Sequence, residues 1–224
     1  MFPDLENYNT KDIRSLYLYS WHFELFGLKE LIECTNKSIN EKIKANIDLC
    51  PKYGASTAYN EVLKYQKLMM EVQLYHNITP LAFQSYLLSL YSVVEASMDR
   101  FCKTCEEKYN LKVALEDFKD RGITRAVNYL EKVVQVETIK SDHRWGKMTI
   151  INDLRNDIIH SCGIIEKKKK VEVYKGELGV TVEDGRVYIT YENIIDMYRY
   201  IEEFMELIFT RDFIDKTKSF IKLE

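Results

Sequence analysis

The chain has 224 residues and a mass of 26.6 kDa, which corresponds to one domain or to a domain with a smaller attachment. Hydrophobic residues make up 46% and charged residues 30%, so the composition excludes a disordered chain. Only 8 glycines and 3 prolines are present, which argues against an all-β fold with its many turns. The net charge of −3 excludes a wholly basic nucleic-acid coat, although a local basic groove remains compatible with it.

Cellular location and redox state can be inferred from the cysteines and the N-terminus. Five cysteines in a chain of this length do not make a disulfide framework. Residues 1–6 are acidic where a signal peptide would be basic, and no short apolar core follows them. The most apolar stretch, residues 87–94, is too short to span a bilayer. We expect a cytoplasmic protein with reduced thiols and no membrane association.

Helical periodicity dominates the first part of the chain. Residues 16–49 carry apolar side chains at mostly three- and four-residue steps, which predicts a long helix. The tract 50–54 contains a proline and a glycine and is expected to stop this helix, because proline cannot continue the backbone hydrogen bonds. A second helix is expected over residues 59–75.

A central helix is predicted next. Thr79 followed by Pro80 has the pattern of an N-cap with proline at the first helical position. The helix that begins there should continue past Cys105, and its apolar residues lie on more than one side. We therefore expect one domain, with an N-terminal helical extension over about residues 1–78 and a core over about residues 79–224.

Shorter helices are predicted over residues 113–119 and 124–134. A further helix should cover residues 142–160, with Ser141 or Asp142 as its cap and a glycine shortly after its end. The period then changes.

Valines alternate with other residues over 171–182, and apolar residues alternate again over 187–189. Between these runs lies Asp184-Gly185, a strong sequence signal for a β-hairpin. A last amphipathic helix should cover residues 191–208. The predicted fold is a mainly α helical bundle with one β-hairpin before the C-terminal helix.

The stretch 152–160 carries the clearest chemical pattern. At about 100° per residue, three apolar residues share one side of the helix, namely Ile151, Leu154 and Ile158. Asn152, Asn156 and His160 are four residues apart and form a polar row on the opposite side, with Arg155 on the flank between the two. The spacing alone is equally compatible with a solvated surface row and with a functional site.

The same residues resemble a known motif. Arg155-Asn156-x-x-x-His160, preceded by an apolar residue and followed within three residues by a glycine, resembles the signature of the HEPN superfamily. The surroundings are also similar: an earlier central helix has an acidic residue within the apolar run 90–96, a tryptophan precedes the motif, and a helix closes the chain. The resemblance covers roughly residues 80–209.

This resemblance implies a helical domain that dimerises through the motif helix and is often a metal-independent endoribonuclease. In such an enzyme the 2′-hydroxyl of RNA attacks its own phosphodiester, and the products carry 2′,3′-cyclic phosphates. His160 would transfer protons near neutral pH. Arg155 would bind phosphate oxygens through its planar fork, and Asn156 would orient the histidine or donate to the phosphate. The family further suggests a toxin or antiphage-defence effector that has RNA as substrate and an antitoxin or defence protein as partner.

Glu95 lies within the apolar run of the central helix. A carboxylate there must face solvent or be paired, because burying a lone charge is costly. An exposed position is the alternative, but we favour pairing with Arg155 across two packed helices. Glu95 is therefore included among the candidate catalytic residues with Arg155, Asn156 and His160.

Lys167, Lys168, Lys169 and Lys170 form a basic run just after the motif helix. Such runs are usually solvated, and this one is expected to open a strand, where lysine also protects an edge. Alternatively, it binds the RNA backbone without sequence selectivity. Three further basic candidates are Arg121, Arg125 and Arg144.

Other signals are weaker. Cys102-x-x-Cys105 lacks two further ligands with paired spacing, so buried helix cysteines are favoured over a metal or redox site. The aromatic residues of 17–23 are expected to pack in the core rather than stack on bases. No glycine-rich phosphate loop and no His-Glu-x-x-His pair is present, so we expect no cofactor and no metal.

Three hypotheses follow. The first is a HEPN-type endoribonuclease acting as a homodimer. The second is a non-catalytic HEPN-like module that binds a nucleotide, RNA or a protein through the same face. The third is a plain helical interaction protein in which the Arg-Asn-x-x-x-His spacing is a coincidence.

Overall fold

The computed structural model describes residues 13–136 and 139–209, with side chains from residue 20 onward. Its described part contains six α-helices: α1 (Ile13–Gly54), α2 (Tyr59–Lys108), α3 (Gly122–Lys132), α4 (His143–Ser161), α5 (Lys168–Leu178) and α6 (Tyr191–Phe209). Two short strands, β1 (Thr181–Glu183) and β2 (Arg186–Tyr188), form one antiparallel hairpin. The prediction of a mainly α chain with one β-hairpin before the last helix is confirmed.

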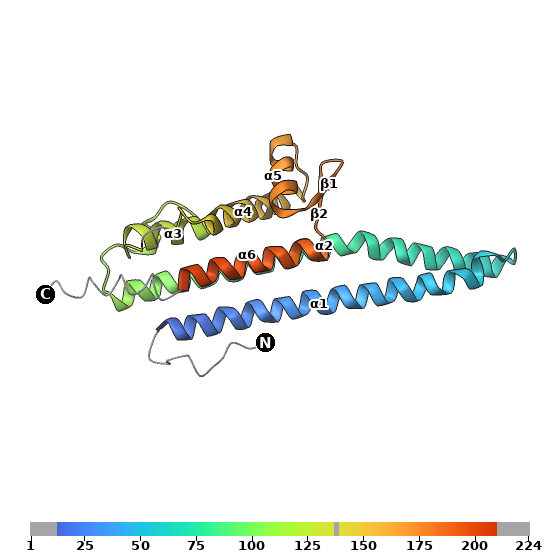
Figure 1. Cartoon of the computed structure of the whole chain (residues 1–224), viewed down its shortest axis with the longest axis horizontal. Coiled ribbons are helices and arrows are strands. Elements are labelled where there is room, and N and C mark those ends of the chain that lie inside the picture. Colours follow the sequence, from blue (N-terminus) through green and yellow to red (C-terminus); the bar gives the residue numbers. More distant parts are fainter. Residues whose placement is uncertain (1–12, 137–138, 210–224) are drawn as a thin grey trace.

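The helices pack in layers around one long hairpin. α1 and α2 run antiparallel over their whole length, and α6 lies between α1 and α4 (Figure 1). α5 and the β-hairpin stand on the α4 side of the molecule, while one end of the α1–α2 hairpin extends beyond all other elements. The core therefore lies at the end of the α1–α2 hairpin where α3, α4 and α6 pack against it.

The first two helices are longer than predicted. α1 continues through Pro51 and ends at Gly54, whereas the expected end was residue 49. The predicted break near residues 75–79 is wrong, because α2 runs unbroken through Pro80. A proline inside a helix removes one backbone hydrogen bond at a cost of about 3 kcal/mol, and helical turns on both sides of Pro80 offset that loss. Thr79, expected as an N-cap, instead donates its hydroxyl to the carbonyl of Tyr75 at 2.6 Å.

The unbroken α2 crosses the boundary proposed near residue 78 between a helical extension and a core. Trp21, Leu25 and Ile32 of α1 are buried in the common core. Trp21 stacks on Phe209 of α6, with ring centroids 6.1 Å apart. For Trp21 this is the core packing that the sequence predicted, whereas Phe23 is exposed.

The middle of the chain follows the predicted order with one correction. The helix expected over residues 113–119 is only a 3₁₀ turn, η2 (Leu115–Asp117). α3 begins two residues earlier than predicted, and six of its side chains are buried. Five of the six are apolar or aromatic, namely Ile123, Ala126, Val127, Tyr129 and Leu130, and the sixth is Asn128. α3 therefore packs firmly against α2.

α5 is the second correction. Alternating valines predicted a strand from residue 171, but residues 168–178 are helical. Tyr174 and Leu178, which are four residues apart, are both buried, and Val171, three residues before Tyr174, is partly buried. Val173, which a strand would have placed on the same face as Val171, is 40% exposed. The helical spacing of these apolar residues thus outweighs the short alternation. The lysine run consequently opens a helix and not a strand.

The β-hairpin follows the sequence signal. Val182 pairs with Val187, and the turn residues Asp184 and Gly185 have φ values of 48° and 79°. Positive φ at both positions matches the twist of the flanking strands, and glycine adopts it without steric strain. Gln84 of α2 ties the hairpin to the long helices by donating from Nε2 to the carbonyl of Val187 at 2.9 Å.

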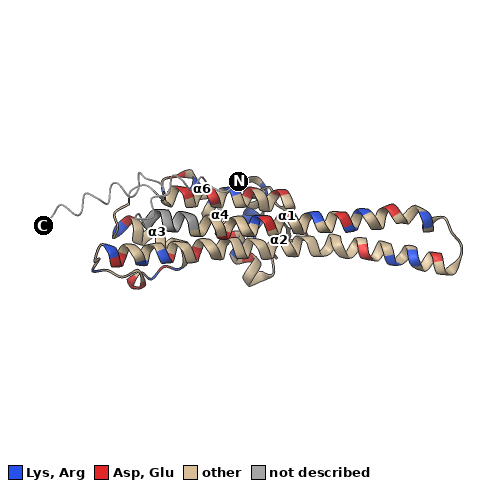
Figure 2. Ribbon diagram, turned by 90° about the horizontal axis from the view of Figure 1, so that it is seen from below, with Lys and Arg blue, Asp and Glu red and all other residues tan. Residues whose placement is uncertain are grey.

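The projecting part of the α1–α2 hairpin, here called the arm, comprises residues 33–54 of α1 and 59–82 of α2. The structure describes every residue of the arm, and Val72 is its one buried side chain. Residues of both charge signs are spread along it (Figure 2). Across the described part of the chain, no helix combines the length and the apolar character that crossing a membrane requires.

Candidate functional site

α4 places the motif residues, and its ends are fixed as the sequence predicted. The carboxylate of Asp142 caps the helix by accepting the backbone N–H of Arg144 at 2.9 Å. Hydrogen bonds from the Arg144 side chain, followed by this backbone bond, lower the pKa of Asp142 to about 2. At the other end, Cys162 and Gly163 have φ values of 50° and 74°, a left-handed ending that suits glycine.

Arg155 is held between two side chains. Its Nη2 donates to Oε2 of Glu95 on α2 at 3.3 Å, and its Nη1 donates to Oδ1 of Asn156 at 2.9 Å. Both members of the ion pair are only about a quarter exposed, with 22% for Arg155 and 28% for Glu95. Asn156 in turn contacts Oδ1 of Asn152 at 3.5 Å. The pair expected between α2 and α4 is therefore present, and it orients the guanidinium beside the polar row.

The guanidinium also lies over an aromatic ring that the sequence analysis did not single out. The Arg155 Cζ atom is 5.3 Å from the ring centroid of Tyr91, which is fully buried one turn before Glu95 on α2. Burial, followed by the negative charge of Glu95, raises the pKa of Tyr91 above its ordinary value. The Tyr91 hydroxyl and Arg155 Nε are buried without a hydrogen-bond partner among the described residues. The spacing of Tyr91 and Glu95, four residues on one helix, is the sequence signal that could have found this ring.

Glu95 is part of a longer charged row on α2. One turn further along, Asp99 forms an ion pair with Arg125 of α3, one of the additional basic candidates. Burial raises the pKa of Glu95, the positive charge of Arg155 opposes that rise, and the negative charge of Asp99 adds to it. Gly122, the first residue of α3, lies directly against Oε1 of Glu95. Arg125 is therefore committed to Asp99 and is not a free phosphate ligand.

His160 lies apart from this network. Its side chain is exposed at the last turn of α4, and no hydrogen bond to its ring occurs within residues 13–136 and 139–209. Five residues separate it from Arg155, so the two side chains leave the helix about 140° apart and about 7.5 Å along its axis. One protomer thus brings Arg155, Asn156 and Glu95 together, whereas His160 lies one turn beyond Asn156 on the polar row and leaves α4 in a different direction from Arg155.

Asp157 connects α4 to α5 and was not among the predicted site residues. Both of its carboxylate oxygens accept from Lys170 Nζ at 2.9 Å, and Oδ2 also accepts from the Tyr174 hydroxyl at 2.8 Å. A hollow of about 320 Å³ lies beside it, with Ser161 and Lys167 in its wall. Reading α5 as a helix would have revealed the link, because Lys170 and Tyr174 are then one turn apart.

The four lysines consequently differ from one another. Lys170 is engaged with Asp157, whereas Lys167, Lys168 and Lys169 are exposed. They lie at the N-terminus of α5, where the helix dipole disfavours positive charge and favours anions. Among the described residues, no ion pair engages Lys167, Lys168 or Lys169, so their three ammonium groups face solvent near the end of the motif helix.

The remaining candidates are engaged or buried. Arg144 is bound to Asp142 through its side chain, and Arg121 is exposed just before α3. Cys102 and Cys105 are buried in α2, and burial raises the pKa of the Cys105 thiol to about 12. In the portion of the chain that the structure describes, no three histidine, cysteine or acidic side chains gather as a metal site would require.

Comparison of the chain with models of protein families, with curated proteins and with solved structures finds no match.

Proposed function

We propose that this protein is a metal-independent endoribonuclease of HEPN type, in which Arg155, Asn156 and His160 of two protomers form the active site. The observation that carries the proposal is the position of the Arg155 guanidinium, which is held by Glu95 of α2 and by Asn156 of α4. The exposed His160 lies on α4, the same helix as Arg155. A rigidly held arginine beside a polar row is suited to binding a phosphodiester.

The proposed reaction needs no external nucleophile. The 2′-hydroxyl of RNA gives its proton to one histidine and attacks the adjacent phosphorus, and the bond from phosphorus to the 5′-oxygen breaks. A second, protonated histidine gives a proton to the leaving 5′-oxygen. The products are a 2′,3′-cyclic phosphate and a 5′-hydroxyl. Arg155 stabilises the charge that develops on the phosphorane oxygens, because the guanidinium keeps its charge throughout.

A dimer is proposed because one protomer does not place Arg155 and His160 on the same side of α4. Ile159 and Ile164, near His160 in sequence, are 44% and 45% exposed, and such side chains favour burial against a second copy. Pairing α4 with its own copy around a two-fold axis would bring two histidines and two arginines to one cleft. Lys167, Lys168 and Lys169 would extend this cleft with positive charge for the RNA backbone.

The test is cleavage of total cellular RNA by the purified protein in excess EDTA. His160→Ala is expected to lower the rate by about 10²–10⁴, and because His160 is exposed the substitution should leave stability unchanged. His143→Ala is the matched control, since His143 is also an exposed histidine of α4 but lies at its opposite end. The wild type and His143→Ala should both release 2′,3′-cyclic phosphate ends.

Equal cleavage by the wild type and His160→Ala would remove His160 from the chemistry. One observation favours the second hypothesis, a non-catalytic module that binds RNA, a nucleotide or a protein. No described residue orients the His160 ring, whereas a histidine that transfers protons is usually held in place by a hydrogen bond. RNA binding without any cleavage would support that function, and loss of the binding in Arg155→Gln would place it on the same face.

A further inference from the structure

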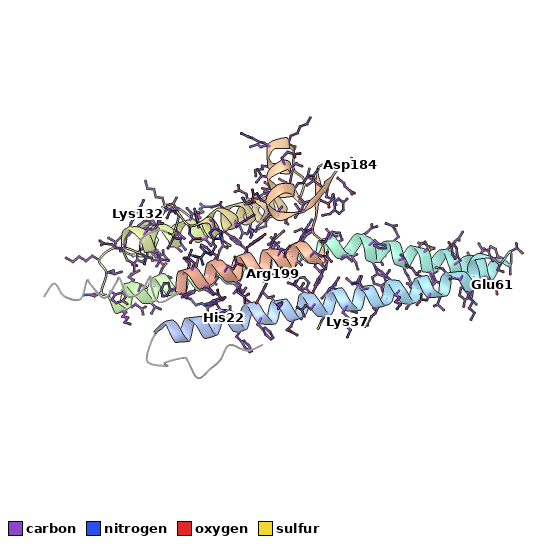
Figure 3. All side chains as sticks on the ribbon, in the orientation of Figure 1. His22, Lys37, Glu61, Lys132, Asp184 and Arg199 are labelled. Atoms are coloured by element: carbon purple, nitrogen blue, oxygen red, sulfur yellow. The ribbon has the colours of Figure 1, made fainter. Side chains whose placement is uncertain are left out.

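The arm has little that stabilises it from within. Between Ile32 of α1 and Phe83 of α2, Val72 alone is buried, although the arm contains more than five helical turns of each helix. Helices in water owe most of their stability to the packing of an apolar face. Figure 3 shows Glu61 near the far end of the arm and Asp184, in the turn of the β-hairpin, near the base of the arm. No other element lies beside the arm between these two points. Within the described part of the chain, the two helices of the arm therefore pack only against each other.

The outer face of α2 in the arm carries a heptad pattern. Six residues recur at alternating steps of four and three and lie within about 40° on either side of one line. We call them the α2 seam: Leu63, Lys67, Met70, Leu74, Asn77 and Leu81. Its four apolar members are 44–72% exposed, and a surface groove of about 660 Å³ follows its first five residues. This spacing is the one by which helices pair in coiled coils.

The free length of the seam has a defined centre. The uncovered stretch of α2 that carries the seam begins at Tyr59, the first residue of the helix. It ends at Gln84, where the β-hairpin covers α2 through the hydrogen bond from Gln84 to Val187. The midpoint of that stretch lies between residues 71 and 72. An antiparallel copy of this stretch reaches its greatest overlap without meeting the β-hairpin when its own midpoint coincides with this one.

The side-chain pattern gives the same centre. In an antiparallel copy with its two-fold axis at Val72, Leu63 lies opposite Leu81 and Met70 lies opposite Leu74. The two polar members, Lys67 and Asn77, then lie opposite each other. A shift of seven residues in either direction breaks this match, because it sets Leu74 against Asn77 or Lys67 against Met70. The seam is thus complementary to itself in one register.

We infer that the arm is a homodimerisation element, in which two copies of the chain pair antiparallel along the α2 seam around a two-fold axis at Val72. The pairing extends over about 27 Å of helix and covers the apolar side chains that the arm leaves exposed. It does not rest on the ribonuclease proposal. Because the arm projects away from the end where α3 and α6 pack, this axis holds the two helical cores apart (Figure 1). A chain that also pairs through α4 would assemble beyond a dimer.

The test is the molar mass of the full chain in solution, measured by light scattering over a range of concentrations. Met70→Glu and Leu74→Lys each place a charge in the seam, at positions whose exposure in the protomer lets the substitution fold. Each variant alone should associate about 100-fold more weakly than the wild type and show half its mass at the same concentration. An equal mixture of the two should recover the mass, because the introduced carboxylate lies opposite the introduced ammonium group.

Leu49→Lys is the matched control, because Leu49 is an equally apolar, 44% exposed residue of the same arm but belongs to α1. It should keep the wild-type mass, and circular dichroism should show the same helix content for all variants. The inference is overturned if the wild type has the same mass as Met70→Glu and Leu74→Lys, or if the mixture stays dissociated. None of these readouts involves RNA cleavage, so failure here is distinct from failure of the proposed enzyme.

Discussion

Gly122 and Glu95 are in direct contact: the first residue of α3 lies so close to the Glu95 carboxylate that a Cβ at Gly122 would overlap Oε1. Gly122 also has a φ of +56°, where a side chain is strained. The glycine thus lets the start of α3 approach the carboxylate whose other oxygen binds Arg155.

Gly122→Ala should lower the free energy of unfolding by about 1–3 kcal/mol, since it adds strain and displaces Glu95. Urea unfolding measures this change. Gly146→Ala is the control, because Gly146 lies in α4 with no atom near its Cβ position. There alanine favours the helix, and stability should rise by about 0.5–1 kcal/mol. Equal effects at both glycines would contradict the contact described here.

Tyr91→Phe should leave the stability unchanged or raise it slightly. The substitution keeps the ring beneath Arg155 and removes a buried hydroxyl that lacks a partner among the described residues. Tyr91→Leu, which also removes the ring, should cost about 1–3 kcal/mol. Chemical unfolding of both variants beside the wild type separates the two roles. A large loss for Tyr91→Phe would mean that the hydroxyl is bonded in solution.

The lysines at the start of α5 should separate into two groups. Replacing Lys167, Lys168 and Lys169 by alanine should weaken RNA binding and reduce the slope of log K against log salt by about 2, as expected for three phosphate contacts on a single strand. Lys170→Ala should instead lower stability by about 1–3 kcal/mol, because it leaves Asp157 without its cation. Fluorescence titration of RNA at several salt concentrations, together with thermal unfolding, distinguishes the groups.

Asp142 should make part of the stability dependent on pH. Its pKa in the folded chain is about 2, below the ordinary 3.8, so the charged form stabilises the fold above about pH 4. That contribution is lost as the pH falls toward 2. Asp142→Ala should therefore cost about 1 kcal/mol at pH 6 and progressively less toward pH 2. Asp184→Asn, in the exposed hairpin turn, should differ little from the wild type at either pH.

Periodicity and local turn chemistry were enough to predict the helical class, the cap and end of α4, and the Asp184-Gly185 hairpin. They failed where two local signals disagreed. Pro80 indicated a helix start, but the helical turns on either side of it continue as one helix. Alternating valines indicated a strand at 171, but the burial of Tyr174 and Leu178 at helical spacing decides for α5.

The site divides in the same way. The pair of Glu95 with Arg155 could be expected, because a carboxylate inside an apolar run needs a cation. The four-residue spacing of Tyr91 and Glu95 indicates that the Tyr91 ring lies near the same site. The contact of Glu95 with Gly122 depends on how α2 and α3 pack, which single-helix patterns do not encode. The direction of His160 relative to Arg155 followed from spacing alone, whereas the binding of Arg155 on the α2 side became visible only in the structure.

The sparse interior of the arm also has a kinetic consequence. Its backbone hydrogen bonds are backed by one buried side chain, Val72, whereas those of α2 beyond Phe83 are backed by the whole core. The arm should therefore open by local unfolding at a free energy well below that of the global transition, as a separate cooperative unit. In hydrogen exchange its amide protons would be lost early from a free protomer and would become protected wherever the arm is covered.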